Sequence, residues 1–87
     1  MVKGLTKSSS PPKVVDVKPN EDHTLLLTFT NGEARLFDAR GLLKYEIYKP
    51  LESIAFFNLA KVDNGGIVWP GDLDLCYHTL YPESEPL

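Results

Sequence analysis

Cys76-x-His78 is the one place where residue types and spacing suggest nucleophilic chemistry. A catalytic thiol needs a base and an orienting group within hydrogen-bond reach. If this segment is a strand, its two side chains share a face and can touch, because residues two apart point the same way. No third group belongs to the pattern, and the only other histidine, His23, is distant in sequence. We therefore predict no catalytic site here.

Three carboxylates, Asp38, Asp72 and Asp74, form a second candidate group. Clustered carboxylates perform general acid and base catalysis or bind a hard cation such as magnesium. The alternative is structural, because a short acceptor side chain at a turn caps backbone N–H groups. Asp38 would follow a strand and Asp72 would end a turn, so we favour the structural role. We predict no bound metal and no cofactor.

Composition narrows the remaining classes of function. The chain has one cysteine, which excludes an internal disulfide and a cysteine zinc site and suits a reducing, cytoplasmic environment. It has no apolar run near the roughly 18 residues that cross a bilayer, and its N-terminus has no apolar signal segment. Because both are missing, we expect no membrane partner. The net charge is −3, and a negative chain repels phosphate, so we expect no independent binding to nucleic acid.

The chain divides into three segments. Residues 1–12 contain the run Ser8-Ser9-Ser10-Pro11-Pro12, which predicts a disordered leader, made basic by Lys3 and Lys7. Residues 13–81 are predicted to form one globular domain, because so short a chain has no room for two cores. Residues 82–87 are predicted to fray.

Asn31-Gly32 gives the clearest turn, between predicted strands at 25–30 and 33–38. The pair supplies the two positive φ angles of a type I′ hairpin, which fixes the register. The expected pairs are Thr30/Glu33, Phe29/Ala34, Thr28/Arg35, Leu27/Leu36 and Leu26/Phe37. The expected core face carries Leu25, Leu27, Phe29, Ala34 and Leu36. Leu26 and Phe37 would then lie together on the opposite face, as an apolar patch unless another segment covers them.

A second hairpin is predicted at Asn64-Gly65, between strands at 59–63 and 66–69. Its register gives the pairs Val62/Ile67 and Ala60/Trp69. Trp69-Pro70-Gly71-Asp72 then matches a type II turn, followed by a last strand in which Leu73, Leu75 and Tyr77 alternate. Trp69 either completes the core or is an exposed interface anchor.

Between the hairpins, apolar residues with helical spacing and Pro50 predict a short helix that ends near Asn58, preceded by an irregular turn. A strand at 14–17, ended by Pro19, opens the domain. The predicted fold class is α+β, with a small mixed or antiparallel sheet of about five short strands in two hairpins and one or two short helices.

The stretch from Val14 to Tyr81 resembles a bacterial family known as domain of unknown function 2442. The residues that carry the resemblance are Pro19, Leu25, Leu27, Phe29, Asn31-Gly32, Phe37-Asp38, Leu42-Leu43, Leu51, Phe57, Ile67 to Asp74, and Leu80-Tyr81. Where many relatives have Pro-Asp before the closing Thr-Leu-Tyr, this chain has Tyr77-His78. The resemblance implies a compact domain that occurs alone, fused to a helix-turn-helix domain, or beside a small companion protein in two-gene modules like toxin–antitoxin pairs.

The leading hypothesis is a non-enzymatic interaction module, pairing with itself or with a small companion protein. Its candidate interface residues are Leu26, Phe37 and Trp69. The second hypothesis is a DNA-associated regulatory accessory, and the third is a small enzyme.

Overall fold

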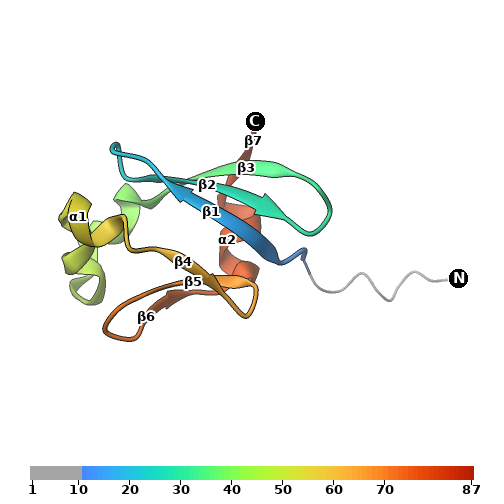
Figure 1. Ribbon diagram of the computed structural model, residues 1–87. Helices are drawn as coiled ribbons and strands as arrows, with labels where there is room; N and C mark the ends of the chain where they lie inside the picture. The colour runs from blue at the N-terminus through green and yellow to red at the C-terminus, as the bar shows by residue number, and fades with distance from the viewer. Residues whose placement is uncertain (1–10) are drawn as a thin grey trace, which may run out of the picture.

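A four-stranded antiparallel sheet, which we call sheet A, joins the two ends of the described chain (Figure 1). The computed structural model describes residues 11–87, so most of the predicted leader lies outside the described residues. The strand order is β1-β2-β3-β7. Their bounds are β1 (Val14–Pro19), β2 (Thr24–Phe29), β3 (Ala34–Asp38) and β7 (Glu85–Pro86).

A second antiparallel sheet, sheet B, has three strands in the order β4-β5-β6. They are β4 (Lys61–Asp63), β5 (Gly66–Trp69) and β6 (Leu73–Leu75). The sheets meet where the Val14 N–H donates to the Gly65 carbonyl oxygen at 2.8 Å. The α+β class is confirmed, although the predicted small sheet of about five strands is two sheets with seven strands in residues 11–87.

The helical segments are short. They are the 3₁₀ segments η2 (Ala39–Lys44) and η3 (Glu46–Glu52) and the helices α1 (Ile54–Phe57) and α2 (Tyr77–Glu83). The single helix predicted near residues 50–58 is broken at Ser53, whose side chain accepts the Phe56 N–H at 3.3 Å and caps α1. Across residues 11–87, every helix is too short to cross a membrane.

The register predicted for the first hairpin is wrong by one residue. Leu26 pairs with Leu36, and Leu25 pairs with Phe37. The loop has three residues, because the Gly32 N–H donates to Phe29 O and the Phe29 N–H donates to Glu33 O, both at 2.9 Å. Gly32 has a φ of 87°, whereas Asn31 is not among the residues with positive φ. Such a loop is a type I turn closed by a left-handed glycine.

The Asn31 side chain explains this choice of loop. Its Oδ1 accepts the Glu33 N–H at 3.0 Å, which supports the turn without a positive φ at Asn31. Because side chains alternate along a strand, a shift of one residue exchanges the two faces of β3. Phe37 therefore points into the core, and Leu36 takes its place beside Leu26 on the opposite face.

The second hairpin has the predicted register, with Val62 opposite Ile67. Asn64 and Gly65 have φ angles of 51° and 82°, as a type I′ turn requires. Gly71 has the positive φ predicted for the next turn, at 86°, and Asp72 follows it with 67°.

The C-terminal segment differs from its prediction. Tyr77 begins α2 rather than continuing a strand, and residues 82–87, predicted to fray, include the end of α2 and strand β7. The register places Arg35 opposite Pro86 and Leu36 opposite Glu85. Ser84, which links α2 to β7, is buried, at 3% exposure.

The core lies between the two sheets, and α2 runs from one sheet to the other (Figure 1). Its fully buried large side chains are Leu25, Leu27, Phe29, Leu51, Phe57, Ile67 and Leu80. Trp69, which the sequence left between a core role and an exposed anchor, is also in the core, at 3% exposure. Its indole N–H donates to the Phe57 carbonyl oxygen at 3.0 Å.

Gly66 allows β5 and β6 to approach each other closely. A Cβ at this position would lie 2.5 Å from the Leu75 carbonyl oxygen, a backbone atom held in the sheet. We expect Gly66→Ala to lower the free energy of unfolding by about 2 kcal/mol or more in urea titrations, because the clash is relieved only by moving a strand. Gly41→Ala is the matched control, since nothing lies within 4 Å of a Cβ there, and we expect a change below about 0.5 kcal/mol. Equal losses in the two variants would contradict this packing.

Candidate protein-interaction surface

The outer face of sheet A, the face turned away from the core, carries a pair of leucines. Leu26 on β2 lies directly opposite Leu36 on β3, and both are partly buried. Lys18 lies opposite Leu26 on β1, and Glu85 lies opposite Leu36 on β7. These four residues form one row across the sheet, which we call the Lys18–Glu85 row.

The two leucines lie outside the apolar core. Leu26 and Leu36 belong neither to the buried cluster nor to the partly buried apolar residues that pack against it within residues 11–87. The helices and sheet B lie on the other side of sheet A in Figure 1. The predicted partner of Leu26 on this face, Phe37, is buried at 5% exposure, so the predicted Leu26/Phe37 patch is replaced by a Leu26/Leu36 patch.

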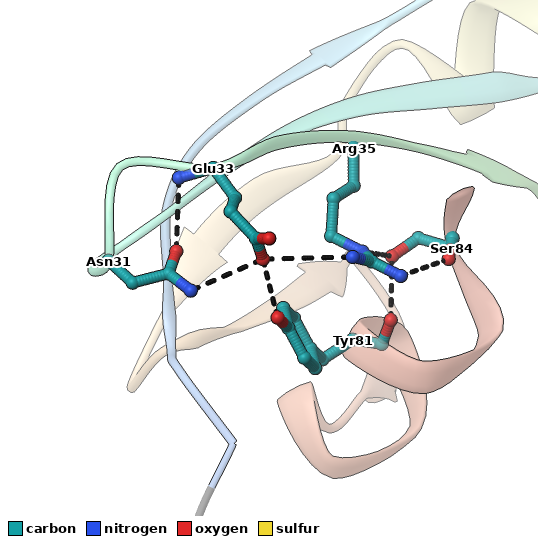
Figure 2. A network of polar contacts seen from close by, with 5 residues as sticks. All are labelled: Asn31, Glu33, Arg35, Tyr81 and Ser84. Atoms are coloured by element: carbon teal, nitrogen blue, oxygen red, sulfur yellow. Dashed lines mark hydrogen bonds and ion pairs between the residues drawn. The ribbon is translucent and has the colours of Figure 1, made fainter. Parts of the chain in front are cut away.

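Arg35 holds the β7 edge of this surface in place (Figure 2). From the inner face of β3 it donates from Nε to Ser84 Oγ at 2.9 Å and from Nη2 to the Ser84 carbonyl oxygen at 2.6 Å. Its guanidinium also lies over the Tyr81 ring, 4.4 Å from the centroid, and its side chain is 13% exposed. A guanidinium presents several donors in a fixed plane, so it binds both oxygens of Ser84 at once. We call this contact the Arg35–Ser84 clamp.

Glu33 completes the network around the clamp (Figure 2). It accepts from the Tyr81 hydroxyl at 2.5 Å and from the Asn31 side-chain amide at 3.2 Å, and it lies 3.6 Å from the Arg35 guanidinium. These donors, the Tyr81 hydroxyl first, lower the pKa of the Glu33 carboxyl. The same hydrogen bond raises the pKa of Tyr81, because its hydroxyl proton is held by an anion. The network therefore ties the first hairpin to α2 while Glu33 is ionised.

Asp38 caps the start of η2. It is the N-cap of η2, accepting the Arg40 N–H at 3.0 Å, and it binds the Arg40 guanidinium through both carboxylate oxygens. The Arg40 side chain lowers the pKa of Asp38. Asp38 ends β3 of sheet A, whereas Asp72 lies in the turn between β5 and β6 of sheet B and Asp74 lies on β6. The three candidate carboxylates are thus divided between the two sheets.

Asp72 and Asp74 line a broad hollow of about 790 Å³ over sheet B, together with Lys61 and Asp63. A row like that of sheet A crosses this hollow, with Lys61 opposite Val68 and Val68 opposite Asp74. The centre of this sheet B row has one apolar side chain, Val68, whereas the sheet A row has two, Leu26 and Leu36. Among residues 11–87, no group of three or more histidine, cysteine or acidic residues is placed to hold a metal ion.

Cys76 and His78 do touch, with Sγ 3.2 Å from Nδ1. Their contact comes from the start of α2, where Cys76 is the N-cap, rather than from the predicted strand. Both are exposed, and the His78 ring stacks on Tyr77 at 4.4 Å. His23 has a different role, because its Nε2 lies 2.9 Å from the Leu51 carbonyl oxygen and its ring packs on Phe57. It links the β1–β2 turn to η3.

A family model described as a protein of unknown function (DUF2442) matches residues 14–86. The chain belongs to this family. The DUF2442 match runs from the first residue of β1 into β7, so the family domain includes the segment for which the sequence predicts fraying. No curated protein and no solved structure matches the chain.

The residues from Trp69 to Leu73, part of the segment that carries the family resemblance, have roles in the core and in a turn. Trp69 and Leu73 are buried core residues, and Pro70-Gly71 makes the turn between them. The sequence interpretation missed Leu36, Lys18 and Glu85 as surface partners of Leu26. Asn31 is the residue from which the outer position of Leu36 could have been predicted. Its side chain also suits a three-residue loop, and that loop shifts the register so that Leu36 lies on the outer face.

Leu26 and Phe37 give a direct test of which face is buried. We expect Leu26→Lys to change the free energy of unfolding by no more than about 1 kcal/mol, because the flexible lysine chain can reach water from the outer face. Phe37→Ala should cost about 3–5 kcal/mol, because it leaves a cavity in the core. Urea unfolding at low protein concentration measures both. A loss for Leu26→Lys as large as that for Phe37→Ala would place Leu26 in the core.

Glu33 should make the stability of the domain depend on acid pH. Its pKa is lower in the folded chain than in the unfolded chain, so the unfolded state binds the proton more readily as the pH falls. Its contribution is therefore present at neutral pH and is lost as the pH falls through the folded-state pKa. We expect the stability difference between the parent and Glu33→Gln to shrink from pH 7 to pH 3, measured by thermal unfolding. Glu46→Gln, on exposed η3, should show no such change.

Proposed function

We propose that this chain is a non-enzymatic protein-interaction module that buries the Leu26–Leu36 surface against another protein chain. The observation that carries the proposal is the position of these two leucines, in direct cross-strand contact on the outer face of a four-stranded sheet. The buried cluster between the sheets is formed without either of them. Apolar side chains gathered on a sheet face and rimmed by charges are typical of an interaction surface.

The charges around the leucines favour a protein partner over nucleic acid. Besides Lys18, the outer face presents the exposed carboxylates of Asp16 and Glu85, and the charge of Asp38 is balanced by the Arg40 guanidinium. Phosphate groups would meet mainly negative charge there. The partner is a second copy of the chain or a small companion protein, and the exposed free thiol of Cys76 suits a cytoplasmic setting.

Protection of position 26 in cells tests the proposal without knowledge of the partner. The probe is Leu26→Cys in a Cys76→Ser background, alkylated in intact cells and as dilute purified protein. We expect alkylation at position 26 to be about twofold or more slower in cells that express the protein at a high level, which corresponds to a partner present at or above its Kd. Glu46→Cys in the same background is the control, because Glu46 is exposed on η3, away from sheet A. Equal cell-to-purified ratios at positions 26 and 46 would overturn the proposed function.

A further inference from the structure

The Lys18–Glu85 row has opposite charges at its two ends and two leucines between them. The register fixes this order, since Lys18 pairs with Leu26, Leu26 with Leu36, and Leu36 with Glu85. Neighbouring strands are about 4.8 Å apart, so the row is roughly 14 Å long. Lys18 and Glu85 are both exposed at its ends.

A row of this kind is complementary to itself. A twofold axis parallel to the strands, lying between two copies, sets Lys18 of each copy opposite Glu85 of the other and Leu26 opposite Leu36. A twofold axis across the strands would instead set Lys18 against Lys18 and Glu85 against Glu85. Electrostatics therefore selects the first arrangement.

The hollow at the Glu85 end suits an incoming lysine. It has a volume of about 300 Å³, and its carboxylates outnumber its one cation, Arg40. The lining residues are Asp22, Thr24, Leu36, Asp38, Arg40, Glu83 and Glu85. Asp38 is neutralised by Arg40, and Asp22 accepts from the Thr24 hydroxyl at 2.6 Å. Glu83 and Glu85 remain to face a lysine ammonium.

The next row along the strands is compatible with the same axis. Thr24 pairs with Asp38 in that row, so Asp38 of one copy would face Thr24 of the other rather than another carboxylate. On the other side, Thr28 pairs with Ala34, and these two would face each other. Asp16 lies at the β1 end of that row, opposite Thr28, and the axis would place it beyond Ala34 of the other copy, near Leu87, whose N–H donates to the Ala34 carbonyl oxygen. Neither row therefore sets two charged side chains of the same sign against each other.

We propose that two copies of the chain associate face to face through the outer faces of sheet A, with Lys18 of each copy against Glu85 of the other. This inference rests on the proposed interaction function and assigns its partner as a second copy. The Arg35–Ser84 clamp is part of the surface, because Ser84 immediately precedes Glu85 and fixes β7 beside β3. A sheet face of this size buries only a few hundred Å² per copy, so the dimer is weak and forms at high protein concentration.

Charge exchange between the two ends of the row tests the arrangement. Sedimentation equilibrium of the purified full chain, at concentrations up to about 1 mM, should show a monomer–dimer equilibrium. Lys18→Glu and Glu85→Lys should each weaken association by about tenfold or more, because each variant sets like charges together twice in the dimer. An equimolar mixture of the two variants should recover association, since the mixed dimer restores opposite charges at both ends. The double variant should recover it as well.

Lys61→Glu on sheet B is the control for Lys18→Glu, because it makes the same change in net charge on an exposed residue of β4, which does not belong to the outer face of sheet A. We expect parental association from it. A mixture that associates no better than the single variants would overturn the face-to-face dimer. A chain that stays monomeric at the highest concentration, while position 26 is protected in cells, would also overturn the dimer but leave the interaction function standing with a different partner. Monomeric behaviour without protection would remove both proposals.

Discussion

The Arg35–Ser84 clamp is the contact on which the arrangement of this domain depends. It joins residues 49 positions apart and brings the C-terminal segment onto the edge of a sheet whose other strands come from the first half of the chain. The guanidinium is mostly buried among Tyr81, Ser84 and β3. A buried cation without these partners would be costly, so the clamp either forms with its hydrogen bonds or the segment separates from the sheet.

The clamp also couples the inner and outer faces of sheet A. Arg35 points inward and binds Ser84, and the next residue, Glu85, points outward beside Leu36. The core side of β7 thus determines where a charged group lies on the exposed side. Glu33, next to the hairpin loop, and Tyr81 on α2 stiffen the same corner, because the Tyr81 hydroxyl donates to the Glu33 carboxylate at 2.5 Å. A change in this corner would reach the outer face without altering any residue on it.

Local turn chemistry predicted part of this fold and failed where a side chain offered a second solution. Asn64-Gly65 gave the right hairpin and register because both residues adopt positive φ. Asn31-Gly32 has the same two residue types, but Asn31 accepts the Glu33 N–H and so supports a loop of three residues. The register shifts by one residue, and the β3 side chains predicted for the core face lie on the outer face. The placement of β7 could not be predicted from neighbouring residues, because Ser84 and Arg35 meet only in the folded chain. Of the predicted interface, Leu26 alone remains on the surface, since Phe37 and Trp69 are needed by the core.

The two edge strands of sheet A limit how the chain can assemble. Pro86 on β7 has no N–H to offer a neighbouring strand, and on the opposite side β1 ends at Pro19 and its first residue is hydrogen-bonded to sheet B. Both margins therefore resist strand addition, which is how sheets grow into open-ended ribbons. Contacts made through the outer face under a twofold axis use the same face of both copies, so neither copy keeps a free face for a third chain. Assembly by this route stops at two chains and cannot propagate into a fibre.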